Sequence, residues 1–121
     1  VHWFSTHFSG YDRRKHDAGL AHYLPVNLGE VPDYYRRFID PPDIVVFKTA
    51  PMDERGFFNF GPNTLWMRAL VERGKTVIVE ETSNLPYVMG EGTGVHVSEV
   101  DYIIPGHDLP LAELPKPPAT D

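Results

Sequence analysis

The chain has 121 residues, a formal net charge of −6 and no cysteine. Its length suits one domain with its own core, and a content of 41% hydrophobic and 23% charged residues excludes a collagen, a coiled coil and a disordered chain. Without cysteine there is no disulfide, thiolate metal site or cysteine nucleophile. The chain has 11 Lys and Arg but 17 Asp and Glu, so a positively charged groove for nucleic acid is not expected.

The ends of the sequence and its apolar runs predict a cellular location. No apolar run approaches the roughly 20 residues of a membrane span, and no charged-then-apolar leader is present. We therefore expect a cytoplasmic protein that does not contact a membrane. Since the chain begins with Val1, we also expect it to be a piece of a longer protein.

The elements of the first half begin after an aromatic-rich and charged stretch, 1–20, that has no clear period. A short strand is predicted at 21–26. A helix is predicted at 31–39, with Pro32 in its first turn and a proline pair after its end. The continuous apolar run within 43–48 predicts a strand that is buried on both faces.

The second half continues with a helix at 63–72, which has one apolar stripe and is followed by Gly74. A buried strand is predicted at 76–79 and a further strand at 95–104. Strand, helix and strand form a βαβ unit with a right-handed crossover, so the fold class is α/β with a mostly parallel sheet. The proline-rich tail, 114–121, is expected to be a linker.

Two long loops are candidates for a binding site, because ligands bind beyond the carboxyl ends of parallel strands. They are 49–61 and 80–94, and both contain glycines that let a backbone approach a ligand. The glycine-rich run 90–94 does not lie between a strand and a helix, so a flexible loop is favoured over a phosphate cradle. Residues 53–55 are expected to form a turn closed by local hydrogen bonds.

Histidines and paired acids offer weaker signals. The sequence contains His2, His7, His16, His22, His96 and His107. Their spacing is not that of paired metal ligands, so structural or solvated roles are favoured and no metal is expected. Glu80 and Glu81 end a predicted strand, where one could act as a base or nucleophile, although such acids more often cap a turn or face water.

Motifs in the second loop and its flanks form an ordered series. A strand ends at Glu80, and Asn84-Leu85-Pro86, Gly90 and the run 95–103 follow. This series resembles the acetyl-CoA hydrolase/transferase family, which includes the 4-hydroxybutyrate, butyryl and acetate CoA-transferases. The family has a strand ending in Glu, an Asn-Met-Pro turn, a Gly and then Ile-His-Val-Ser.

Further motifs extend the resemblance over about 23–113. Pro51, Asp53, Gly56 and Gly61 are similar to the family's Ser-Pro-x-Asp-x-x-Gly-Tyr-x-x-x-Gly, and residues 108–113 resemble its closing Asp-x-Pro-Leu-x-Glu. The chain departs from the family at two positions in the second loop. Thr82 stands where the family usually has Asn, and Tyr87 where it usually has Arg. These departures indicate an altered specificity.

The resemblance implies the three-layer CoA-transferase (NagB/RpiA-like) fold, present here as a partial domain, with 1–121 as a segment of the N-terminal half. It implies a CoA-transferase that moves CoA between an acyl-CoA and a carboxylate such as acetate or 4-hydroxybutyrate, with CoA as substrate and no metal. Whether water can replace the acceptor carboxylate stays open. Because the family's nucleophilic glutamate lies in the second half, no catalytic residue is expected here and Glu80 does not take that role.

The partners implied are the two substrates, the C-terminal half and a second copy of the chain. The residues expected to face substrate are Asn84, Pro86, Gly90 and Gly61, with Asp53, Asn63 and Thr49 in second rank. An exposed apolar face is expected around Trp3, Phe4, Phe8, Phe57 and Phe58. Two other hypotheses stay open: a stand-alone α/β module that binds a small ligand or a protein without catalysis, and a histidine-rich metal protein.

Overall fold

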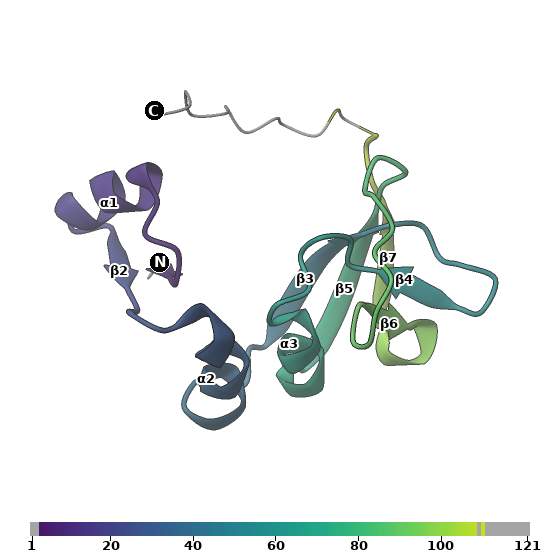
Figure 1. Ribbon diagram of the computed structural model, residues 1–121, viewed down its shortest axis with the longest axis horizontal. Helices are drawn as coiled ribbons and strands as arrows, with labels where there is room; N and C mark the ends of the chain where they lie inside the picture. The colour runs from purple at the N-terminus through teal and green to yellow at the C-terminus, as the bar shows by residue number, and fades with distance from the viewer. Residues whose placement is uncertain (1–2, 109, 111–121) are drawn as a thin grey trace, which may run out of the picture.

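The N-terminal part is a small βαβ unit. The computed structural model describes residues 3–108 and 110. In it, β1 (Trp3–Ser5) pairs in parallel with β2 (Ala21–Tyr23), and α1 (Gly10–Asp17) connects them. Figure 1 shows this unit apart from the larger sheet. Neither β1 nor α1 is among the elements predicted from the sequence, because α1 buries no residue and so leaves no apolar period to detect.

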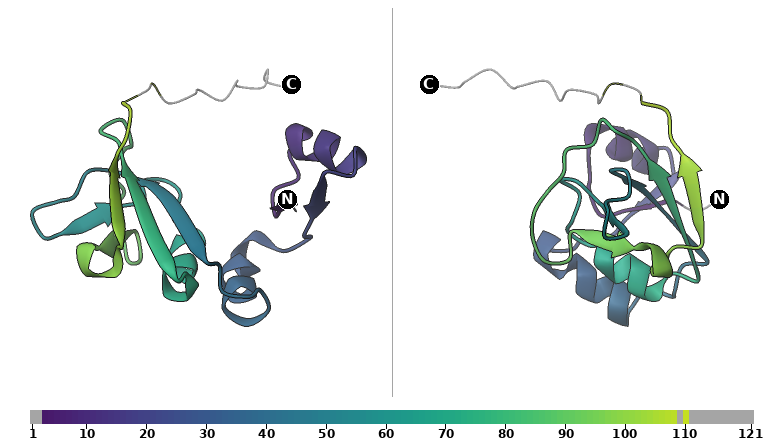
Figure 2. Two further views of the ribbon diagram at one scale, coloured as in Figure 1. Left: turned by 180° about the vertical axis from the view of Figure 1, so that it is seen from behind. Right: turned by 90° about the vertical axis from the view of Figure 1, so that its right-hand side faces the viewer.

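Helix α2 (Val31–Arg37) connects this unit to the rest of the fold and confirms the predicted helix. It follows a single 3₁₀ turn at Leu28–Glu30. Its first residue, Val31, is 1% exposed. Seen from behind in Figure 2, α2 lies between the N-terminal unit and α3 (Met67–Arg73). An ion pair of 2.9 Å from Arg36 Nε to Glu72 Oε2 joins the two helices.

The larger sheet is parallel and confirms the predicted fold class. Its order is β3 (Ile44–Thr49), β5 (Thr76–Glu81) and β7 (Tyr102–Pro105). Helix α3 lies between β3 and β5 in sequence and packs on the sheet, which makes the predicted βαβ unit. A short antiparallel pair of strands, β4 (Phe57–Asn59) and β6 (Gly94–His96), packs near it.

The core lies on one face of this sheet. Alternate residues of β3 and β5 face α3 and the β4–β6 pair, as the two-residue period of a strand requires. The buried cluster consists of Val45, Phe47, Phe58, Phe60, Met67, Val71, Val77, Val79 and Val95. Phe58 is wholly buried, so its expected place on an exposed apolar face was wrong.

The opposite face of the sheet is bare in the part of the chain that the structure describes. Ile44 and Val46 are each 60% exposed, and Tyr102 and Ile104 lie on the same face by their register with β5. The prediction that residues 43–48 are buried on both faces was therefore wrong. The sheet and one covering layer are present, as in a partial domain of a three-layer fold.

The predicted strand at 95–104 was also wrong. The chain instead forms β6, a 3₁₀ turn at Val97–Glu99 and then β7. His96 Nδ1 accepts the Ser98 backbone N–H at 3.2 Å, and Glu99 Oε2 accepts the His96 N–H at 3.4 Å. This reciprocal capping turns the chain, so β6 and β7 join different sheets.

Other boundaries differ from those predicted. Helix α3 begins at Met67 instead of 63, because turns occupy the residues before it. The short strand β4 lies within the loop predicted at 49–61. The predicted linker, 114–121, lies outside the described residues. No helix in the described part of the chain is long and apolar enough to cross a membrane.

We expect Gly94→Ala to destabilise the fold, because Gly94 pairs with Asn59 where the strands approach closely. A Cβ at Gly94 would lie 2.6 Å from the Phe58 carbonyl oxygen, which is part of the backbone and cannot turn away. The free energy of unfolding, measured in urea, should fall by about 1–3 kcal/mol. Gly29→Ala is the control, since its nearest neighbour lies 3.9 Å away. An equal effect of both substitutions would contradict this explanation.

Candidate functional site

The loops after β3 and β5 meet at one edge of the sheet, as predicted from the parallel strands, and the chain after β7 joins them there. The Thr82 N–H donates to the Thr49 carbonyl oxygen at 2.9 Å. The Met52 N–H donates to Glu81 Oε1 at 3.1 Å. These bonds hold the start of the first loop against the end of β5.

Asn59 connects the first and second loops through its side chain. It is 2% exposed. Its Nδ2 donates to the Val88 carbonyl oxygen at 2.9 Å, while its Oδ1 accepts the N–H groups of Val88 at 3.0 Å and of Gly61 at 2.9 Å. The Asn59 amide therefore donates one hydrogen bond to the Val88 backbone and accepts one from it, as the backbone of a neighbouring strand would.

Gly61 lets the second loop pack directly on the first. Its φ is +62°, and a Cβ there would lie 2.6 Å from Leu85 Cγ and 3.1 Å from the Pro86 carbonyl oxygen. Gly61 is thus required both by its backbone conformation and by this contact. A side chain at Gly61 would meet the backbone of Pro86, so two of the predicted site positions lie close together.

Asp108 ties the loop after β7 to the second loop. Its Oδ1 accepts the Ser83 N–H at 2.9 Å and the Thr82 hydroxyl at 3.3 Å. The Ser83 backbone N–H holds the pKa of this carboxyl below its usual 3.8. Asn84 follows in the same turn, where its N–H donates to Thr82 Oγ1 at 3.4 Å.

Asp53 closes the turn predicted at 53–55. Its Oδ1 accepts the backbone N–H groups of Arg55 and Phe57, each at 2.9 Å. Arg55 Nη2 approaches Oδ2 at 3.3 Å. The Phe57 N–H, followed by the bonds from Arg55, holds the pKa of Asp53 below 3.8. The predicted local turn is confirmed, and Asp53 positions Arg55.

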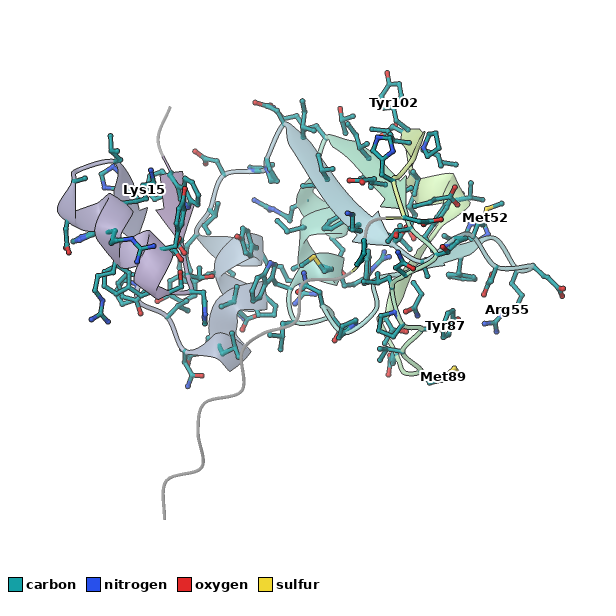
Figure 3. The ribbon with its side chains drawn as sticks, turned by 90° about the horizontal axis from the view of Figure 1, so that it is seen from above. Lys15, Met52, Arg55, Tyr87, Met89 and Tyr102 are labelled. Carbon is teal, nitrogen blue, oxygen red and sulfur yellow. The ribbon has the colours of Figure 1, made fainter. Side chains whose placement is uncertain are left out.

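A cavity of about 310 Å³ lies between the first and second loops, and we call it the loop pocket. The backbone of Gly90, Gly92 and Gly94 forms part of its wall. Arg55 and Tyr87 line it from the two loops. Figure 3 shows Arg55, Tyr87 and Met89 gathered on the same side of the molecule.

A second cavity of about 320 Å³ lies beside β3 and α3. Asn63, Lys48 and Leu85 contribute to its lining. Asn63 and Gly90 therefore line different cavities. Thr49 is 0% exposed, lines neither cavity, and its hydroxyl has no hydrogen-bond partner among the described residues.

Three residues at these loops are not among the site residues predicted from the sequence: Arg55, Asn59 and Tyr87. The sequence does mark the position of Tyr87, because the residue there departs from the family pattern. It does not mark Asn59, since the role of Asn59 depends on a backbone group 29 positions away. Glu80, left outside the site, forms an ion pair of 3.5 Å with Lys48 on the bare face of the sheet.

No group of three or more His, Asp or Glu side chains that could hold a metal ion occurs among residues 3–108 and 110. The hypothesis of a histidine-rich metal protein has no cluster to support it there. The absence of a metal from the function stays a prediction.

The loops just described carry the motifs of a known family. The family of the acetyl-CoA hydrolase/transferase N-terminal domain matches residues 1–115. The chain belongs to the acetyl-CoA hydrolase/transferase family. The resemblance inferred from the loop motifs is confirmed.

Two curated relatives are CoA-transferases by name. Butyryl-CoA:acetate CoA-transferase of Anaerostipes caccae is 42% identical over 93% of this chain and 25% of its own length. 4-Hydroxybutyrate coenzyme A transferase of Clostridium kluyveri is 31% identical over 93% of this chain and 26% of its own length. The chain thus spans about a quarter of the length of these relatives.

Solved structures agree on the fold. RipA from Yersinia pestis is 26% identical, with a TM-score of 0.82 over 99% of this chain and 29% of that chain. 4-Hydroxybutyrate CoA-transferase from Porphyromonas gingivalis is 25% identical, with a TM-score of 0.70 over 94% of this chain and 30% of that chain. The CoA-transferase-like α/β fold and its partial character are confirmed.

We expect Asn59→Ala to loosen the two loops, because it leaves the N–H groups of Gly61 and Val88 and the Val88 carbonyl without their partner. The loss should be about 2 kcal/mol or more of unfolding free energy. Amide hydrogen exchange at Gly61 and Val88 should speed up. Asn63→Ala, at an exposed asparagine nearby, is the matched control and should change stability by less than about 0.5 kcal/mol. Unchanged exchange at Val88 would contradict the role of Asn59.

Acid should weaken the 53–55 turn, because the folded pKa of Asp53 lies below its ordinary 3.8. A lowered carboxyl pKa contributes stability above the unfolded pKa and loses it as pH falls through the folded pKa. Asp53→Asn should therefore destabilise the chain at pH 7, and the difference from wild type should shrink below about pH 3.8. Thermal unfolding across this range measures it. Glu54→Gln, in the same turn, is the control; a difference that persists at low pH would contradict the ionic explanation.

Proposed function

We propose that this chain forms one wall of the active site in a CoA-transferase that moves CoA between an acyl-CoA and a carboxylate such as acetate or 4-hydroxybutyrate. The observation that carries the proposal is the family match together with two loops, tied by Asn59, at the carboxyl edge of the sheet. The names of relatives acting on acetate, butyryl-CoA and 4-hydroxybutyrate support the substrate class.

The proposed wall consists of Asn84, Pro86, Gly90 and Gly61. Gly61 and Gly90 both have positive φ, at +62° and +149°, where a side chain would be strained. Backbone at these points can approach a substrate closely. Asp53 acts indirectly by positioning Arg55. Asn63 and Thr49 have weaker support, because Asn63 lines the other cavity and Thr49 is buried.

The physical role of such a wall follows from the chemistry. A carboxylate that attacks an acyl-CoA needs a site that excludes water and has donors fixed before the reaction begins. Loops held by side-chain to backbone hydrogen bonds meet the second requirement. In this proposal the remainder of a longer polypeptide supplies the nucleophile and closes over these loops. A second copy of the protein is a further proposed partner, and the cytoplasm the proposed location.

The test is CoA exchange by the full polypeptide that carries these residues. Butyryl-CoA and labelled acetate should yield labelled acetyl-CoA and free butyrate. Asn59→Ala should lower this exchange by about tenfold or more, because the wall loses its fixed geometry. Gly29→Ala, in the 3₁₀ turn before α2 and outside both loops, should leave most of it. Folding of each variant is checked by circular dichroism.

Three results would overturn the proposal. Release of free CoA without transfer to any short acid would make the protein a hydrolase. A native chain that ends near Asp121 and shows no exchange would favour a stand-alone binding module. Undiminished CoA exchange by Asn59→Ala would show that the two loops are not part of the active site.

A further inference from the structure

The loop pocket has one cationic side chain among the residues that line it, Arg55. Tyr87 lines the same pocket from the opposite loop, and Figure 3 shows it on the same side of the molecule as Arg55. The rest of the lining is backbone and largely apolar side chains, including Phe57 and Met89. A single guanidinium thus lines a pocket whose walls are partly polar backbone and partly apolar side chains.

The guanidinium of Arg55 has donors to spare. It has five N–H groups, and one of its nitrogens, Nη2, donates to Asp53 Oδ2 at 3.3 Å. Asp53 Oδ1 is already occupied by two backbone N–H groups. The side chain of Arg55 is 75% exposed. Arg55 is therefore oriented by its own turn and still able to bind an anion.

The pocket suits a carboxylate better than a phosphate. A guanidinium fork matches the two oxygens of a carboxylate. Asp53 offsets part of the charge of Arg55, and the exposed acid Glu91 lies between two of the lining glycines. A doubly charged phosphate would meet one partly neutralised cation and a nearby acid. A singly charged carboxylate needs less positive charge.

The apolar side chains fit a short hydrocarbon body. Phe57 is 41% exposed and Met89 is 84% exposed, so both can pack on a bound molecule. A volume of about 310 Å³ is at the small end for ligand sites. The pocket is suited to a short acid and not to a whole acyl-CoA.

We propose that the loop pocket binds the carboxylate group of a short aliphatic acid, with the Arg55 guanidinium as its anchor and the Tyr87 hydroxyl as a second donor. This deepens the proposed function, on which it rests, by naming specificity-determining residues for the acceptor. Neither residue is required to take part in bond making or breaking.

The first test is direct binding of butyrate to the full polypeptide, measured by calorimetry. Arg55→Gln keeps a polar side chain and removes the guanidinium and its charge, so the dissociation constant for butyrate should rise about tenfold or more. Arg55→Lys should recover part of the affinity, and Tyr87→Phe should raise the constant by a few-fold. Arg37→Gln, at an exposed arginine on α2, is the control and should change nothing. Butyramide, a neutral probe of similar shape, should bind weakly and equally to all variants.

The second test is kinetic. In the exchange assay, Arg55→Gln should raise the KM for the carboxylate acceptor by about tenfold, with kcat and the KM for the acyl-CoA little changed. Both tests use variants whose near-ultraviolet circular dichroism matches that of the unsubstituted protein. Tyr87→Phe removes one exposed hydroxyl and serves if Arg55→Gln fails to fold.

The outcomes separate this inference from the proposed function. Butyrate binding that depends on Arg55, without any CoA transfer, would support the pocket and overturn the transferase. CoA transfer by Arg55→Gln with an unchanged KM for the acceptor would overturn the proposal of carboxylate binding in the loop pocket. The proposed transferase function would still stand. A rise in the KM for acyl-CoA instead, with lost binding of adenosine 3′,5′-bisphosphate, would show that the anion is a phosphate of CoA and would overturn the carboxylate proposal.

Discussion

The Asn59 amide is the interaction on which the rest of the site depends. Between β5 and β6 the second loop forms no strand, so the backbone of Val88 has to find a partner elsewhere. A primary amide supplies both a donor and an acceptor, and Asn59 uses both on the same residue while it also accepts the Gly61 N–H. Aspartate lacks the donor and leucine lacks both groups. Because Asn59 is buried, water cannot replace these bonds.

The sheet gives a second constraint, since it is packed on one face only in the described part. The apolar run at β3 supplies residues for two faces, yet α3 and the β4–β6 pair cover just one of them. Apolar side chains such as Ile44, Val46 and Tyr102 remain exposed. This is the expected state of a segment that spans about a quarter of its relatives and belongs to a family with a three-layer fold.

The sequence predicted those elements whose signals are local. Helix α2, the β3–α3–β5 unit and the turn at Asp53 all follow from apolar period, proline position or a side chain that reaches a nearby backbone group. Helix α1 buries nothing, and β4 and β6 are three-residue strands that exist because they pair with each other across the chain. The break at His96 depends on a capping pair inside an apolar run. Among the candidate site residues, the glycine and proline positions came from the resemblance to the family motifs, whereas Asn59 gains its role from a backbone group of the second loop, which no local pattern marks.

The charged and polar side chains of the loop pocket also come from two different loops. Backbone N–H groups hold the Asp53 carboxylate, and that carboxylate orients Arg55, so the cation comes from the first loop. The second loop supplies Tyr87, where the family pattern usually has an arginine. The position of the Arg55 guanidinium relative to Tyr87 therefore depends on how the first loop packs against the second. Asn59 fixes that placement through Val88, which directly follows Tyr87, so the geometry of the proposed anion site and the packing of the loops have a common origin.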